Sequence, residues 1–346
     1  MGLLDPARAA GEARYVLTAE QHDYPDLDAL EDDYHRRGWT DGLPVVPPTP
    51  ERVEKFLAIA GLEAGDLVGT VPTRDATVTA ELVAINAVMA GCAPEYMPVV
   101  VAAVRAHLDE MANCHSTTGT LSGAAQIVVV NGPVRTEIGV HGGAGCFGPG
   151  WRANATIGRA LRLVIRNACR AVPGVFDRAS FSTPARYSFC FGEDEEDSPW
   201  TPMHVERGFA PDQSAVTVHS TMTMLAAGDY SSRAPEGVAD TIVAALRRQG
   251  SAGDRWLGDE TNVLLVVGPE QRRIFTDGGW SKGDFRSYAW DRLQAPPGPG
   301  ERPVKLGRPE GLLMVAAGGP GMPETWIMYP HLGRAITQPV LPRADV

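Results

Sequence analysis

Apolar and polar positions recur along the chain with two periods, one helical and one extended. From Thr156 to Arg170 the apolar residues follow helical spacing and the arginines fall off the apolar stripe, which predicts an amphipathic helix. Asn154 is a suitable N-cap for this helix. From Val216 to Met224 apolar and polar residues alternate singly, which predicts a half-buried strand.

Other segments extend this pattern. The acidic stretch Leu27–Arg37 and the nearly all-apolar stretch Ala80–Ala90 predict helices. Thr49-Pro50 places a proline at the first position of a helix, where proline is favoured. Short apolar runs at 187–191 and 312–316 predict strands. Because helices and strands alternate, we predict an α/β fold.

The order of these elements repeats along the chain. A strand ending in Asn131-Gly132-Pro133 is followed by Gly142-Gly143, and one ending in Val267-Gly268-Pro269 is followed by Gly278-Gly279 at the same offset. An Ala-Pro-Glu tripeptide and a helix precede each strand. An arginine, a helix and a further strand follow each Gly-Gly pair. We predict two similar α/β lobes from an internal duplication. The alternative is two unrelated α/β segments that resemble each other only because they share this class.

The repeat divides the chain into three parts. Residues 1–65 lie outside it and are predicted to form an N-terminal cap segment packed on the first lobe. The first α/β lobe is predicted over residues 66–208 and the second over 209–346. A loop rich in proline and charge, residues 209–213, separates them.

Composition and charge narrow the classes of protein. With 346 residues the chain exceeds one small domain, and its 44% hydrophobic and 21% charged residues are ordinary for a globular protein. The net charge of −11 without a basic run argues against nucleic acid or an anionic membrane as partners. No apolar stretch has the length of a membrane span or a signal peptide, so we expect a cytoplasmic protein. The composition is compatible with a homo-oligomer as well as with a monomer.

The five cysteines give no sign of a disulfide framework. Their number is odd and no pair has the CxxC spacing of a zinc knuckle, so we expect reduced thiols.

A glycine-rich loop at 141–152 precedes the amphipathic helix. Glycines such as Gly148 and Gly150 let backbone N–H groups converge, and the helix N-terminus adds partial positive charge, so phosphate or carboxylate would be stabilised there. Arg152 would complete this anion site. The spacing matches neither a P-loop nor a dinucleotide fingerprint. The alternative is a tight strand-to-helix connection without a ligand.

Two cysteines are candidate nucleophiles. Cys146 lies in the glycine-rich loop shortly before the helix, a position that lowers a thiol pKa, and His141 would serve as its base. Cys92 lies between two predicted helices beside Glu95. Either cysteine would otherwise be a small or buried structural residue.

Charged residues elsewhere suggest further chemistry. The acidic run 193–197 follows a strand and precedes His204, so Glu193 or Glu196 is a candidate general acid or base, and the group a candidate metal site. The alternative is a solvated loop. In the second copy, Ser281 and Lys282 open a helix, and Lys282 is one of three lysines in the chain. Its charge would suit an anionic group.

Four motifs carry a resemblance to a known family. They are GCAPEY from residue 91, GPGWRANATIGRA from 148, SPWTPMH from 198 and GGWSKGDFR from 278. The chain resembles an uncharacterised bacterial family with these motifs, loosely associated with selenocysteine- or cysteine-containing redox proteins, over most of residues 40–335. A redox-active Sec or Cys tetrapeptide is absent from this chain. The resemblance implies site positions at Cys92, Glu95, Arg152, Asn154, Trp200, His204 and Lys282.

Three hypotheses about function follow. The first is an enzyme that acts on a small anionic metabolite by cysteine-centred chemistry, as a lyase, hydrolase or transferase, between the two lobes and without a required cofactor. The second is a metal-dependent oxidoreductase that holds a divalent metal with His141, His204 and carboxylates. The third is a non-catalytic protein whose lobes clamp a small ligand.

Overall fold

The computed structural model describes residues 15–249, 262–304 and 306–344 and shows a mixed fold of helices and sheet. Residues 1–14 lie outside this range, and so does most of the N-terminal segment in which a signal peptide would be sought. Lys305 also lies outside it. The helices are α1 (Leu27–Arg37), α2 (Pro50–Ala60), α3 (Ala80–Ala90), α4 (Met97–Leu108), α5 (Cys114–Thr118), α6 (Val134–Glu137), α7 (Arg152–Asn167), α8 (Met203–Glu206), α9 (Pro235–Gln249), α10 (Pro269–Asp277) and α11 (Lys282–Gln294).

The strands fall into two sheets. A hairpin is formed by β1 (Leu67–Val71) and β2 (Ala76–Thr79). The large sheet contains β3 (Ala125–Asn131), β4 (Cys190–Gly192), β5 (Ala215–Gly228), β6 (Val263–Val267), β7 (Leu312–Ala316), β8 (Glu324–Pro330) and β9 (Ile336–Pro339). None of the helices in the described ranges is long and apolar enough to cross a membrane.

The pattern of parallel and antiparallel pairings in the large sheet is the same when followed from either edge. The strand order is β4-β3-β5-β8-β6-β7, with β9 added beside β5. The outer pairs β3/β4 and β6/β7 are parallel, whereas the pairings of β3 with β5, β5 with β8 and β8 with β6 are antiparallel. Each half of the sheet therefore consists of a parallel pair followed by one antiparallel strand.

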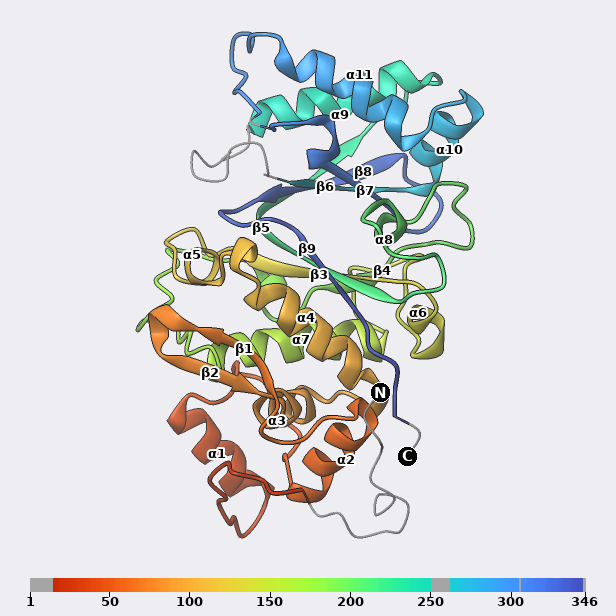
Figure 1. Ribbon diagram of the computed structural model, residues 1–346. Coiled ribbons are helices and arrows are strands. Elements are labelled where there is room, and N and C mark those ends of the chain that lie inside the picture. The colour runs from red at the N-terminus through yellow and green to blue at the C-terminus, as the bar shows by residue number, and fades with distance from the viewer. Residues whose placement is uncertain (1–14, 250–261, 305, 345–346) are drawn as a thin grey trace.

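The two halves of the sheet fold over each other. Figure 1 shows β6, β7 and β8 in one layer and β3, β4 and β9 in another, with α9, α10 and α11 outside the first layer and α4 and α7 outside the second. Successive side chains of a strand point to opposite faces. In β3, Val128 and Val130 accordingly enter the core beneath α4 and α7, while Ile127 and Val129 enter a central core shared with Leu264 of β6. Both faces of β3 are covered, which explains its uninterrupted apolar run at 127–130.

The long strand β5 joins the layers. Its residues 215–221 pair with β3, and its residues 221–228 pair with β8, with a register irregularity between Thr221 and Thr223. Residues 215–221 are buried on both faces. The prediction of a half-buried strand at 216–224 is therefore wrong for its first part, because a central strand is covered on both sides.

Several predicted elements are confirmed. Helices over 27–37, from Pro50, and over 80–90, and the strand 312–316, have the predicted bounds. The amphipathic helix begins at Arg152, one turn earlier than predicted, and its N-cap is Trp151. Asn154 is thus not the N-cap but a buried residue of the first turn.

The part of residues 1–65 that the structure describes packs into the core of the first half. Tyr34 of α1 and Phe56 of α2 belong to the same buried cluster as α3, α4 and α7. The buried carboxylate of Glu81 on α3 accepts hydrogen bonds from Thr18, which ties the preceding segment to this core. The boundaries at residues 65 and 208 remain predictions.

Candidate functional site

A pocket of about 320 Å³ lies where the two halves of the sheet meet, and we call it the inter-half pocket. The first half contributes loop residues 144–148. The second half contributes Val266, Gly268, Glu324 and Trp326, together with residues 317–320 and Met322 of the loop after β7. Gly268 and residues 317–320 follow the carboxyl ends of the parallel strands β6 and β7, which is where α/β sheets usually bind ligands.

Close backbone contacts bring these two loops together. The amide of Gly318 donates to the carbonyl of Gly142 over 2.8 Å. A Cβ atom on Gly319 would come within 2.4 Å of Ala144, and one on Gly142 would come within 2.4 Å of the carbonyl oxygen of Gly192. Glycine is therefore required on both sides of the contact.

Asn154 holds the glycine-rich loop in place. Its Oδ1 accepts the amide N–H of His141 over 2.9 Å, and its Nδ2 donates to the carbonyls of His141 and Cys146 over 2.9 and 3.2 Å. The side chain is buried, so these three bonds replace water for the loop backbone. Asn154 shapes the loop instead of contacting a ligand in the pocket.

The thiol of Cys146 forms part of the pocket wall. Burial raises the pKa of this thiol to about 11, although the backbone N–H groups of Gly318, Cys146 and Phe147 act in the opposite direction. At neutral pH the group is therefore a thiol. The expected lowering of its pKa is wrong, because desolvation outweighs the amides around the sulfur.

His141 is engaged away from that thiol. Its ring stacks on Trp151 with 3.8 Å between centroids, and its Nε2 lies 3.0 Å from the carbonyl oxygen of Ala144. The expected hydrogen-bonded pair of His141 and Cys146 is not among the contacts of the described residues. Gly150, whose φ is +120°, belongs to the turn that leads into α7.

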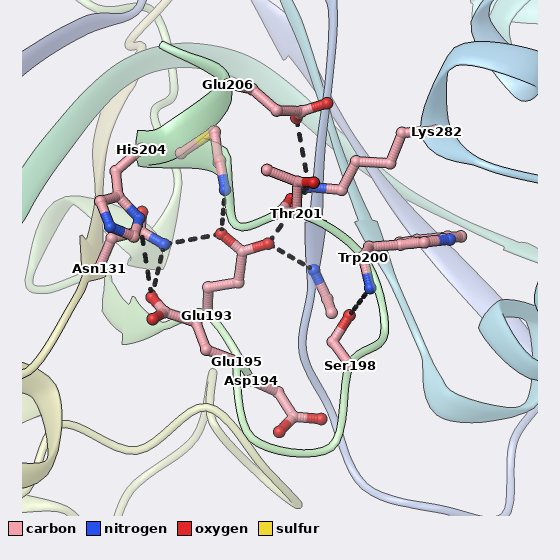
Figure 2. A network of polar contacts seen from close by, with 12 residues as sticks. Asn131, Glu193, Asp194, Glu195, Ser198, Trp200, Thr201, His204, Glu206 and Lys282 are labelled. Carbon is pink, nitrogen blue, oxygen red and sulfur yellow. Dashed lines mark hydrogen bonds and ion pairs between the residues drawn. The ribbon is translucent and has the colours of Figure 1, made fainter. Parts of the chain in front are cut away.

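The acidic run begins with a buried residue, Glu193, beside the inter-half pocket and ends with two exposed ones, Glu196 and Asp197. Figure 2 shows Glu193 at the centre of a network, with Oε2 accepting from Asn131 Nδ2 at 2.7 Å and from the Met203 amide at 2.8 Å. Its Oε1 accepts from Lys282 Nζ and the Ala316 amide, both at 3.4 Å. Four donors thus occupy the two oxygens of a carboxylate that is 1% exposed. The arrangement favours a structural role for Glu193 over general acid or base chemistry.

Lys282 is equally well satisfied. Its Nζ, on a side chain that is 4% exposed, donates to the Thr201 carbonyl at 2.7 Å and to the carboxylates of Glu193 and Glu206. Burial acts to raise the pKa of Glu206, but the Arg286 and Lys282 cations outweigh it and hold that pKa below its usual value. The three N–H groups of Lys282 are therefore all used within the protein.

Asp194, Glu195 and Glu196 also have cationic partners. Glu195 accepts from Asn131 and from the Gly132 amide and lies 3.3 Å from Arg135, which also pairs with Glu196. Asp194 pairs with Arg272 of α10 at 3.0 Å. The run is therefore a connection between the two halves of the sheet. Its last two acids, Glu196 and Asp197, are exposed, as expected of a solvated loop.

Three more candidate residues surround this network. His204 of α8 is fully buried with Nδ1 4.0 Å from Glu195, and neither ring nitrogen has a hydrogen-bond partner within the described ranges. Trp200 packs against Phe275 in the core of the second half. Ser281 forms the N-cap of α11 through a capping box with Asp284.

Arg152, Cys92 and Glu95 form a third, separate group. Arg152 donates to the carbonyls of Gly91 and Cys92 at the end of α3, over 3.1 to 3.3 Å. Burial raises the pKa of the Cys92 thiol to about 12. Glu95 lies half-buried in the 3₁₀ turn Pro94–Tyr96. Of the sequence candidates, only Cys146 and Gly148 line the inter-half pocket.

Comparison with protein-family models, curated proteins and solved structures finds no match. In the part of the chain that the structure describes, no group of three or more His, Cys, Asp or Glu side chains is arranged to hold a metal ion.

Sequence reasoning missed a cluster around Cys114. A hydrogen bond from Cys169, opposed by burial and supported by His107 and Arg74, holds the pKa of Cys114 well below its usual value, and the pKa of Cys169 is raised. Arg74 Nη2 lies 3.3 Å from the Cys114 sulfur. The four residues are far apart in sequence, and no local signal relates them.

Sequence reasoning also missed the second wall of the pocket. Residues 318–321 read Gly-Gly-Pro-Gly directly after the predicted strand 312–316. A glycine-rich stretch at the carboxyl end of a strand is the signal that would have identified this loop.

Proposed function

We propose that the protein binds a small organic molecule in the inter-half pocket, and that this molecule is neutral or positively charged. One observation carries the proposal: two glycine-rich loops from different halves of the sheet enclose a single pocket at the ends of parallel strands. Concave sites of this size at such positions are typical of small-ligand binding. This corresponds to the third hypothesis from the sequence.

The lining favours a particular ligand chemistry. Trp326 and Phe147 lie edge to face with 5.8 Å between centroids and offer apolar ring surface, and Met322 adds to it. The charged side chain in the lining is the carboxylate of Glu324, which accepts a hydrogen bond from Trp326 Nε1. Arg152 and Lys282 are bonded elsewhere, so the pocket does not favour the anion expected from the sequence.

Benzamidine should bind the pocket more tightly than benzamide, and benzoate should bind least. The positive amidinium is attracted to Glu324, whereas the carboxylate of benzoate is repelled. Isothermal titration calorimetry with the three ring-matched probes measures the order. We expect at least a tenfold difference between benzamidine and benzoate, about 1.4 kcal/mol.

Two variants distinguish this site from others. Glu324→Gln should remove the preference for benzamidine over benzamide, and Trp326→Ala should weaken both. Leu121→Ala, at an exposed apolar residue outside the pocket lining, is the control and should change nothing. Equal affinity for benzamidine and benzoate, or unchanged binding by Trp326→Ala, would overturn the proposal.

A second candidate is the cysteine-centred enzyme of the first hypothesis. The supporting observation is that the Cys146 sulfur lies in the pocket wall with backbone N–H groups from Gly318 and Phe147 beside it. Such groups stabilise a thiolate or an oxyanion once it forms. Because His141 is engaged elsewhere, a group of the bound substrate would have to take the proton from the Cys146 thiol.

Alkylation of Cys146 by chloroacetanilide should accelerate about tenfold per pH unit from pH 7 to pH 10. Only the thiolate reacts, and its fraction rises tenfold per unit below a pKa of about 11. Cys114, whose pKa is lowered, should instead react at a rate that changes little over this range. Peptide mapping by mass spectrometry separates the two rates. A Cys146 rate independent of pH would contradict the cause given for its pKa.

We further infer that the two halves of the sheet are copies of one unit. The parallel pairs β3/β4 and β6/β7 occupy corresponding places in the strand order. Gly132-Pro133 and Gly268-Pro269 follow β3 and β6, and α6 with α7 corresponds to α10 with α11. In the sequence, a tryptophan also follows the last predicted strand of each repeat. The correspondence does not extend to these residues, since Trp200 precedes α8 and Trp326 lies in β8.

A further inference from the structure

A second pocket, of about 470 Å³, lies in the first half of the molecule and is distinct from the inter-half pocket. One wall is formed by Arg162 and Arg166, which are one helical turn apart on α7 and therefore share a face. The segment 171–187, which leads from α7 towards β4, supplies most of the opposite side. We call this the arginine pocket.

The acids that line the arginine pocket are already neutralised. Asp41 receives two hydrogen bonds of 2.8 Å from Arg159, and Asp177 pairs with Arg186 at 2.7 Å. Arg162 and Arg166 have no carboxylate within ion-pair distance among the described residues. The pocket therefore has two positive charges that are not ion-paired, on a protein whose net charge is −11.

Within the part of the chain that the structure describes, these two cations are bonded to neutral oxygens. Arg162 donates to the Arg186 carbonyl over 3.1 Å and to the side chain of Gln126, and Arg166 donates to the Gly38 carbonyl over 2.8 Å. Burial and the neighbouring Arg186 lower the pKa of Arg162 to about 9, and burial lowers that of Arg166. An anion between them would stabilise both charges.

Aromatic rings border the same pocket. Phe181 is 94% exposed and Tyr187 is 51% exposed, and both belong to the lining. A fully exposed phenylalanine at the edge of a pocket is apolar surface that a ligand could cover.

We propose that the arginine pocket binds a small molecule in which a phosphate or carboxylate is attached to an aromatic ring. The guanidinium groups of Arg162 and Arg166 receive the anion through charge-assisted hydrogen bonds, for which the planar arginine fork is suited. Phe181 and Tyr187 contact the ring. The proposal does not depend on the function proposed for the inter-half pocket.

Phenyl phosphate tests the site directly. Calorimetry at low ionic strength should show binding to the unmodified protein, with inorganic phosphate binding more weakly. Arg166→Gln should reduce the affinity for phenyl phosphate at least tenfold, and Arg162→Gln should do the same. Phe181→Ala should lower the affinity for phenyl phosphate to that for inorganic phosphate.

The controls isolate the two arginines. Arg178→Gln removes an exposed arginine of the same segment that does not line the pocket, and should bind as the unmodified protein does. Should Arg162→Gln fail to fold by circular dichroism, Arg166→Gln decides alone. Trp326→Ala should bind phenyl phosphate normally, which separates this site from the inter-half pocket. No binding at millimolar phenyl phosphate, or equal affinities for the Arg166 and Arg178 variants, would overturn the proposal.

Discussion

Replacing Glu193 by alanine should lower the free energy of unfolding by about 3–5 kcal/mol, because it removes the more deeply buried of the two carboxylates that pair with the buried Lys282 cation. The substitution also removes the acceptor for the amides of Met203 and Ala316 and one of the two carboxylate acceptors of the Asn131 side chain. Urea denaturation followed by circular dichroism measures the loss.

Matched variants separate the buried pair from ordinary surface charge. Glu196→Ala in the same acidic run removes a side chain that is 60% exposed and should cost less than about 1 kcal/mol. Lys282→Met should cost about as much as Glu193→Ala. The double variant Glu193→Leu with Lys282→Met should be more stable than the sum of the single effects implies, since it leaves neither charge unpaired.

Equal effects of Glu193→Ala and Glu196→Ala would refute the buried network as a source of stability. Such a result would mean that water enters the space between the sheet halves and solvates Lys282.

The helices that sequence predicted well are those whose pattern is local. Leu27–Arg37 is preceded by the N-cap Asp26 and followed by Gly38 in a left-handed conformation, so both ends are determined within the segment. Ala80–Ala90 likewise lies between the N-cap Thr79 and Gly91. The start of α7 was missed because Trp151 makes no side-chain capping bond, which leaves no residue type to recognise.

The candidate residues were chosen for unusual chemistry, and the structure separates them by function. Lys282 stood out as a rare lysine and Glu193 as the first acid of a charged run, yet they bond to each other across 89 residues of sequence. Their meeting depends on the sheet folding over itself, which no local pattern specifies. For the same reason the second wall of the inter-half pocket, residues 317–322, was not associated with Cys146.

Asn154 shows how a residue can be singled out correctly for the wrong reason. Asparagine beside a helix start suggested a cap, but the same amide group satisfies the backbone of a loop that begins 13 residues earlier. Both roles use the same short polar side chain, whose amide oxygen accepts and whose NH2 group donates hydrogen bonds. Only the burial of the site distinguishes them.

Asn154→Leu should destabilise the protein by about 2–4 kcal/mol and abolish benzamidine binding in the inter-half pocket. Leucine has a similar volume but leaves the His141 amide and the Cys146 carbonyl without the Asn154 partner, and the His141 carbonyl keeps only the Gly192 amide. Each buried unsatisfied group costs about 1–3 kcal/mol. Urea denaturation and calorimetry measure the two effects. Ala155→Leu, at the exposed neighbouring position, is the control and should stay within about 0.5 kcal/mol of the unmodified protein.

Asn154→Asp tests the donor half of the same interaction through its pH dependence. Aspartate keeps the acceptor for the His141 amide but places a carboxylate oxygen against the carbonyls of His141 and Cys146, so its folded-state pKa should rise above the unfolded value of about 3.9. A raised folded pKa means that the folded state holds the proton more tightly, and stability therefore falls as pH increases above about 4. The variant should thus lie closer to the unmodified protein at pH 4 than at pH 7 in urea denaturation. A deficit that does not change with pH would mean that Asn154 Nδ2 does not donate to the loop, and that the glycine-rich loop owes its shape to its glycines alone.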